Sequence, residues 1–98
     1  MGIDWSNTVT AFDEIVAEAK SLMSAKNHDY GESWREMRLP SITDQILIKV
    51  RRIQRLEELK TRGLSPKVSE GLEAEYRDIL NYCVFALIKL KEEAEATR

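Results

Sequence analysis

Apolar residues recur at helical spacing in the first third of the chain. Between Thr8 and Lys26 they follow steps of three and four residues, at Val9, Phe12, Val16, Ala19 and Met23. Most charged side chains of this segment fall on the opposite face of such a helix. The pattern predicts an amphipathic helix over residues 8–26, capped at its start by Asn7 or Thr8.

A second helical pattern runs from Ser41 to Gly63, directly after Pro40. Ser41 is the expected N-cap, and Asp44, three residues later, completes an approximate capping box with Asp in place of Glu. Gly63 suits the position just past the helix end, because glycine readily adopts the left-handed backbone conformation found there.

A third helical pattern runs from about Ser69 to Glu93. Its segment from Ile79 to Leu90 is apolar nearly all round, so one short neighbouring helix cannot cover it. We therefore expect a second copy of the chain to cover the remaining surface. A helical turn is expected within residues 32–38, and no strand.

These patterns predict an all-α fold, in which three main helices form an antiparallel bundle. Three helices in 98 residues make a thin bundle, and dimerisation would complete its core. No repeat or low-complexity segment divides the chain. Residues 1–98 are therefore expected to form a single helical domain, and the protein a homodimer.

One cation interrupts the apolar face of the second helix. That face consists of Ile42, Ile46, Ile53 and Leu56. Lys49 falls in its middle, with Gln45 and Arg52 on its shoulder. A cation that points into a core is costly unless it is paired, so Lys49 should have an anionic partner.

The third helix offers that partner. Its polar side chains on one face are Glu75, Asp78, Asn81 and Tyr82. In an antiparallel hairpin, Arg52 would lie level with Asp78, and Lys49 level with Asn81. Two interpretations remain open: a site for a charged small molecule, or an ion-pair network that only fixes the register of the hairpin. In a site, the carboxylates could hold Mg²⁺ and the two cations could contact phosphate oxygens.

The segment KNHDYGESW, residues 26–34, combines a helix end with side chains suited to recognition. Gly31 allows the positive φ of a helix stop. Tyr30 and Trp34 offer flat apolar faces to a base, and further polar contacts could come from Lys26, Asn27 and Asp29. The alternative is a packed connector in which Trp34 fills the core.

Composition narrows the class of protein. Hydrophobic residues make up 43% of the chain and charged residues 33%, with a net charge of −2. This mixture is typical of a soluble globular domain and does not favour direct nucleic-acid binding. The single cysteine, Cys83, lies in an apolar run and is expected to be inert core, which suits a reducing, cytoplasmic compartment. The longest apolar run is too short and too polar to span a membrane.

The sequence EYRD, Glu75 to Asp78, followed by ILNY, resembles the second metal motif of the all-α, MazG-like nucleoside triphosphate pyrophosphohydrolases. In that family an E-x-x-D pairs with an E-E-x-x-E on the preceding helix, and together they bind Mg²⁺. Here Glu57 and Glu58 are followed by Thr61, which replaces the third acid. The resemblance implies that Mg²⁺ would bind Glu75 and Asp78, and that any reaction would be pyrophosphohydrolysis.

A resemblance to a second family covers most of the chain, from about Lys26 to Leu90. KNHDYGESW, SITDQILIKVRRIQRLEE and SEGLEAEYRDILNYCVFALIKL resemble three segments of the nucleotide-modification-associated helical domain, type one. The matching positions are Lys26, Asp29, Tyr30, Gly31 and Trp34; Thr43, Asp44, Gln45, Lys49, Arg52 and Ile53; and Glu73 or Glu75 ahead of Asn81 and Tyr82. The resemblance implies a role in bacterial or phage nucleotide metabolism.

Together these observations predict a small-molecule site. Its reactive centre would be formed by Lys49, Arg52, Glu75 and Asp78. Its substrate contacts would come from Lys26, Asn27, Asp29, Tyr30, Trp34, Gln45, Asn81 and Tyr82. The leading hypothesis is that the protein binds, or binds and hydrolyses, a nucleotide or modified nucleotide with a divalent cation. The alternative is a non-catalytic helical interaction module whose buried ion pairs only fix the fold.

Overall fold

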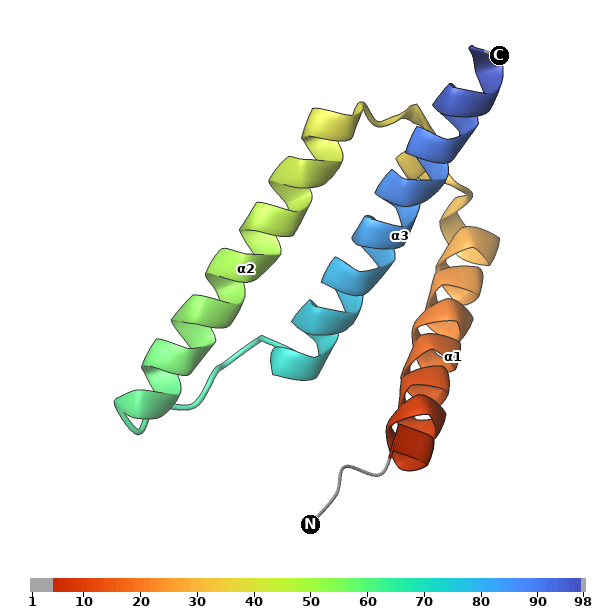
Figure 1. Ribbon diagram of the computed structural model, residues 1–98. Coiled ribbons are helices and arrows are strands. Elements are labelled where there is room, and N and C mark those ends of the chain that lie inside the picture. The colour runs from red at the N-terminus through yellow and green to blue at the C-terminus, as the bar shows by residue number, and fades with distance from the viewer. Residues whose placement is uncertain (1–4, 98) are drawn as a thin grey trace. The chain divides into compact units, whose positions relative to one another are not determined.

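The computed structural model describes residues 5–97 and contains only helices in that range (Figure 1). The elements are α1 (Trp5–Tyr30), the 3-10 turn η1 (Ser33–Glu36), α2 (Leu39–Thr61) and α3 (Leu72–Ala96). The all-α prediction with three main helices is confirmed, and η1 lies within the predicted helical turn. None of these helices is long and apolar enough to cross a membrane.

The chain divides into two compact units between Gly31 and Glu32. The first unit contains α1, and the second contains η1, α2 and α3. The expectation that residues 1–98 act as one domain stays a prediction.

Helix α1 is longer than the pattern predicted, because it spans 26 residues and starts at Trp5. Asn7 and Thr8 therefore lie inside the helix, and the prediction that one of them caps it was wrong. The helix ends where Gly31 adopts a φ of 72°, and the Gly31 N–H donates to the carbonyl of Asn27 at 2.8 Å. The positive φ expected at this glycine is confirmed.

The N-cap of helix α2 lies three residues earlier than expected. This residue is Arg38, in an extended conformation and without a side-chain cap, and Pro40 lies in the first turn. Proline is tolerated there because the first N–H groups of a helix have no partner within the helix. Ser41 is therefore not the N-cap, and its own N–H donates to the carbonyl of Arg38 at 2.9 Å.

The C-terminal end of α2 matches the prediction. Gly63 follows the C-cap with a φ of 70°. Its N–H donates to the carbonyl of Lys60 at 3.0 Å, and the Leu64 N–H donates to Leu59 at 2.8 Å. These two bonds form a Schellman motif, which satisfies carbonyls that the helix itself leaves open.

Helix α3 starts three residues later than predicted. Gly71, with a φ of 104°, occupies the N-cap position, and this backbone conformation keeps the preceding residues out of the helix. The Ser69 hydroxyl accepts a hydrogen bond from the Gly71 N–H at 3.0 Å. The connection between α2 and α3 therefore spans residues 62–71 and is longer than a tight turn.

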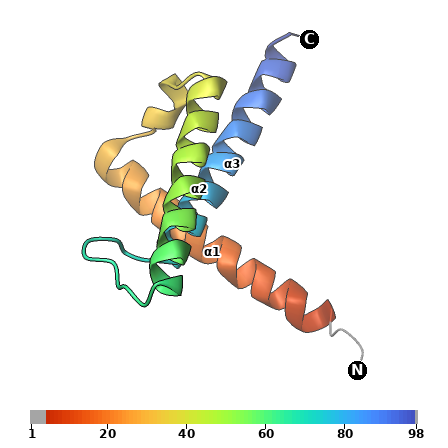
Figure 2. The same ribbon diagram turned by 90° about the vertical axis from the view of Figure 1, so that its left-hand side faces the viewer.

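Helices α2 and α3 pack side by side within the second unit (Figures 1 and 2). Ile42 and Ile53 of α2 are buried, as is Trp34 of η1, which is only 6% exposed. The Trp34 ring stacks on Phe85 of α3, with centroids 4.4 Å apart and planes within 2° of parallel. Trp34 therefore fills the core between η1 and α3, as the connector alternative expected.

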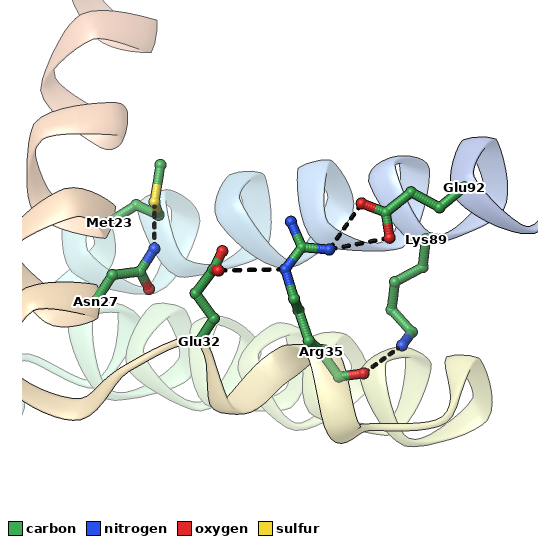
Figure 3. A network of polar contacts seen from close by, with 6 residues as sticks. All are labelled: Met23, Asn27, Glu32, Arg35, Lys89 and Glu92. Atoms are coloured by element: carbon green, nitrogen blue, oxygen red, sulfur yellow. Dashed lines mark hydrogen bonds and ion pairs between the residues drawn. The ribbon is translucent and has the colours of Figure 1, made fainter.

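Arg35 links η1 to the C-terminal half of α3 (Figure 3). Its guanidinium donates from Nη1 to both carboxylate oxygens of Glu92, at 2.7 and 2.9 Å, and its Nε lies 3.3 Å from Glu32. Lys89 donates to the Arg35 carbonyl at 2.8 Å. The hydrogen bond to Glu92, and then the contact with Glu32, raise the pKa of Arg35 above its ordinary value.

Much of α3 remains uncovered. Five residues of the predicted all-round apolar segment and its N-terminal flank are exposed: Tyr76, Cys83, Val84, Leu87 and Leu90. The expectation that Cys83 is core was wrong for the single chain. A neighbouring helix can cover only one stripe of α3, and Cys83 lies on another.

Candidate functional site

Lys49 of α2 points at two carboxylates of α3. Its Nζ lies 3.0 Å from Oδ2 of Asp78 and 3.8 Å from Oε2 of Glu75. The three side chains are 14%, 22% and 12% exposed, respectively. The cation on the apolar face thus has the anionic partners that its position required.

The register of the two helices differs from the expected one by about one helical turn. Arg52 lies 3.9 Å from Glu75, not level with Asp78, and Lys49 meets Asp78, not Asn81. The sequence pattern gives the face of each helix, but the ten-residue connection 62–71 does not fix how far one helix slides along the other.

A pocket of about 570 Å³ lies beside these ion pairs, entirely within the second unit. Helix α2, the connection and helix α3 all contribute to its wall. The lining residues are Lys49, Arg52, Arg55, Leu56, Val68, Ser69, Glu70, Ala74, Glu75 and Asp78. The pocket therefore combines three cations and three carboxylates with an apolar part, as sites for small charged ligands do.

Glu75 carries an unsatisfied acceptor in this wall. Its Oε2 is inaccessible to solvent and accepts no hydrogen bond from the part of the chain that the structure describes. The Lys49 ammonium at 3.8 Å attracts it without forming a hydrogen bond. Unsatisfied buried polar atoms are costly and uncommon, and each calls for an explanation; the Trp34 indole nitrogen is a second such atom among the described residues.

The carboxylates of this site do not form a ready metal site. Within residues 5–97, no three His, Cys, Asp or Glu side chains come together in a way that could hold a metal ion. The Lys49 ammonium already contacts the Asp78 oxygen that a cation would need. Thr61, which stands where the MazG-like motif has its third acid, donates its hydroxyl to the carbonyl of Glu57 at 3.0 Å. These contacts show no preformed cluster of three acidic ligands among the described residues, and Mg²⁺ binding by Glu75 and Asp78 stays a prediction.

The pocket brings together the four residues predicted for the reactive centre, but not the other predicted residues of the second unit. Gln45, Asn81 and Tyr82 are half-buried and do not line it. Tyr82 instead meets Phe85 edge-on, with centroids 6.1 Å apart. Trp34 is stacked in the core. As ligand contacts, these four residues stay a prediction.

The remaining predicted residues lie on the last turns of α1, in the first unit. Tyr30 is 79% exposed. The Asn27 side-chain amide donates to the Met23 sulfur at 3.0 Å (Figure 3). Oδ1 of Asp29 lies 3.0 Å from Nδ1 of the adjacent His28. Lys26 is exposed to solvent on α1. A role for these residues in ligand binding also stays a prediction.

Sequence reasoning missed one charged lining residue that it could have found. Arg55 follows Arg52 by three residues, and such positions are neighbours on one helical face. By contrast, Val68, Ser69 and Glu70 belong to the connection, which has no periodicity. No pattern in the sequence places them beside α2.

The comparisons with known proteins identify the family. A family model described as nucleotide modification associated domain 1 matches residues 26–90, about two thirds of the chain. The matched segment contains all of α2, the connection and every residue that lines the pocket. The comparisons with curated proteins and with solved structures gave no match. On the strength of the family match, this chain belongs to the nucleotide modification associated domain 1 family.

Proposed function

We propose that this protein binds a nucleotide or modified nucleotide in the pocket between α2 and α3. The observation that carries the proposal is the open pocket of about 570 Å³ beside Lys49, Arg52, Glu75 and Asp78. Its size falls in the range of small-molecule sites. The family description associates the domain with nucleotide modification, which supports a role in nucleotide metabolism. We propose that this role lies in the cytoplasm of a bacterium or a phage-infected cell.

The wall of the pocket suits the two halves of a nucleotide. Leu56, Val68 and Ala74 give it an apolar part, against which a base or sugar could pack. Cationic side chains of α2 line another part and can bind phosphate oxygens. The carboxylates of α3 can accept hydrogen bonds from sugar hydroxyls or from the amino groups of a base.

Binding is supported better than hydrolysis. A MazG-like pyrophosphohydrolase needs a metal that the carboxylates hold, and here Lys49 already pairs with Asp78, while Thr61 stands at the third acidic position. A divalent cation such as Mg²⁺ would therefore accompany the phosphates of the nucleotide and would not reside in the free protein.

The alternative function is a helical interaction module whose ion pairs only stabilise the fold. The direct contact of 3.0 Å between Lys49 and Asp78 favours it. The open pocket and the unsatisfied Glu75 oxygen are not needed by such a module. A thermal-shift screen with nucleosides, nucleotides and inorganic phosphate, each with and without Mg²⁺, separates the two functions.

The binding function predicts that at least one nucleotide raises the melting temperature of the wild type. The same nucleotide should leave Asp78→Asn unchanged or nearly so, and should still stabilise Asp44→Asn. Asp44 is an exposed α2 residue that does not line the pocket, so it is a matched control. If no nucleotide shifts the wild type, the interaction module becomes the better account.

We also propose that the helices form an antiparallel bundle and that a second copy of the chain, packed on the exposed stripe of α3, completes it. Tyr76, Leu87 and Leu90 of that stripe are 57%, 65% and 49% exposed, and burying them would stabilise a dimer. Light scattering should show a dimer at micromolar concentration for the wild type and a monomer for Leu87→Lys. A monomeric wild type would overturn this assembly.

A further inference from the structure

Two arginines of the pocket are more exposed to solvent than Lys49. Arg52 and Arg55 lie one turn apart on α2 and both line the pocket. Their side chains are 56% and 57% exposed, whereas that of Lys49 is 14% exposed. The arginines can therefore reach a ligand from solvent, and Lys49 has much less room to do so.

The charge of Lys49 is already matched inside the protein. Asp78 lies 3.0 Å from its ammonium and Glu75 lies 3.8 Å from it. One cation with two carboxylates this close offers no net positive field to a phosphate. A phosphate that approached Lys49 would also meet the negative charge of both carboxylates at short range.

The arginines keep most of their donors available. Arg52 makes one long contact of 3.9 Å with Glu75, and Arg55 pairs through Nη1 with Glu58 at 3.0 Å. The Arg55 pair joins two exposed residues of one helix, and pairs of this kind contribute little and exchange readily. Each guanidinium has five N–H donors in a planar fork that suits phosphate oxygens.

The carboxylates of the pocket limit how much negative charge it accepts. Three of them, Glu70, Glu75 and Asp78, offset the three cations, so the lining has no net charge. A phosphate monoester carries a charge of about −2 near neutral pH, and on this neutral lining it leaves a smaller negative excess beside the two exposed arginines than a longer phosphate chain would. A triphosphate would place additional negative charge beside carboxylates that have no further cation in the lining to offset it.

We propose that Arg52 and Arg55 form the phosphate-binding end of this pocket and that its ligand is a nucleoside monophosphate. Lys49 is then a positioning residue, which holds Glu75 and Asp78 in place on α3. This inference rests on the proposed nucleotide-binding function and adds to it a residue, Arg55, and a phosphate state. A longer phosphate chain would bring Mg²⁺ with it, whereas this ligand needs no divalent cation, because it carries less negative charge and the arginine N–H groups bind its phosphate directly.

The test is calorimetric titration of the full chain in a metal-chelating buffer at fixed ionic strength. The titrants are the common nucleosides, their monophosphates, their triphosphates and inorganic phosphate. The proteins are the wild type, Arg52→Gln, Arg55→Gln and Arg51→Gln. Arg51 is an exposed arginine of α2 that does not line the pocket, so its variant removes the same charge elsewhere on the helix. Circular dichroism confirms that each variant is folded.

The wild type should bind at least one monophosphate more tightly than its nucleoside, its triphosphate and inorganic phosphate. Arg52→Gln and Arg55→Gln should each weaken that binding on the order of tenfold, as expected for loss of a charged hydrogen bond. Nucleoside binding should stay the same in both variants, and Arg51→Gln should resemble the wild type.

The outcomes that would overturn the inference differ from those that would overturn the proposed function. Unchanged monophosphate affinity in Arg55→Gln, or tighter binding of the triphosphate, removes the arginine assignment and leaves nucleotide binding intact. If inorganic phosphate binds as tightly as every nucleotide, the pocket recognises only the anion, and the assignment of a nucleoside monophosphate falls. If the wild type binds no nucleotide at all, both proposals fall together.

Discussion

Within residues 5–97, two clusters of charged side chains contact α3, and they differ in how many of their polar atoms have a hydrogen-bond or ion-pair partner. At the C-terminal end of α3, Arg35 donates two hydrogen bonds to Glu92, while Lys89 donates to the Arg35 carbonyl. This cluster is exposed, and each of its charges has a close partner. We refer to it as the Arg35 cluster.

The second cluster, formed by Lys49, Glu75 and Asp78, is less exposed and less complete. One Glu75 oxygen has no hydrogen bond within the described residues, and a pocket opens beside the ion pairs. We refer to it as the Lys49 cluster. A cluster that only joined two helices would gain from closing this pocket and satisfying that oxygen. The proposed function assigns a structural role to the Arg35 cluster and the ligand to the Lys49 cluster. The open pocket carries this contrast more than the unsatisfied oxygen does, because the buried Trp34 indole nitrogen beside the Arg35 cluster also has no hydrogen-bond partner within the described residues.

The largest expected effect comes from the core beneath the Arg35 cluster. Trp34→Ala removes the ring that stacks on Phe85 and that the Arg35 guanidinium covers at 4.5 Å. We expect it to lower the free energy of unfolding by about 3 kcal/mol, as large-to-small core changes do. Urea denaturation measures the loss. A loss too small to detect would mean that this core contributes little, and the contrast between the clusters would then fail.

Substitution in the Lys49 cluster should cost less stability than Trp34→Ala but should abolish nucleotide binding. Lys49→Met leaves Glu75 and Asp78 side by side without a cation, and we expect a cost of about 2 kcal/mol. Adding Glu75→Gln and Asp78→Asn to this variant should recover part of the stability but not nucleotide binding. Urea denaturation and calorimetry report the two properties separately. Full binding by the folded triple variant would contradict the ligand role of the cluster.

The smallest effect should follow a change in the Arg35 cluster itself. Arg35→Gln removes an exposed ion pair with Glu92, and exposed pairs contribute little to stability. We expect a slight fall in melting temperature and an unchanged affinity for nucleotide. A loss of affinity as large as that of Arg55→Gln would mean that the two clusters are coupled through α3.

The sequence predicted the helices better than their ends or their register. Helical periodicity placed Lys49 on an apolar face and predicted carboxylate partners for it on α3. The structure brings these groups together. The starts of α2 and α3 were each misplaced by a few residues. Neither Arg38 nor Gly71 gives α2 or α3 a side-chain cap that a sequence motif could reveal.

The pocket illustrates what periodicity cannot supply. Glu70 lies in a long connection, where no repeating pattern relates it to α2. Trp34 could have packed in a core or against a ligand, and only the position of Phe85 shows that it stacks in the core. Both positions depend on contacts between residues far apart in the chain, which one sequence does not encode locally.

The most direct test is a nitrogen-15 NMR titration of the wild type with nucleoside monophosphates. Binding in the pocket predicts that the backbone resonances of Ser69, Ala74 and Glu75 shift progressively and saturate. The indole resonance of Trp34, stacked in the core, should move much less. Nucleotide-dependent shifts concentrated at Trp34 and absent from the pocket, or no shifts with any nucleotide, would contradict the account.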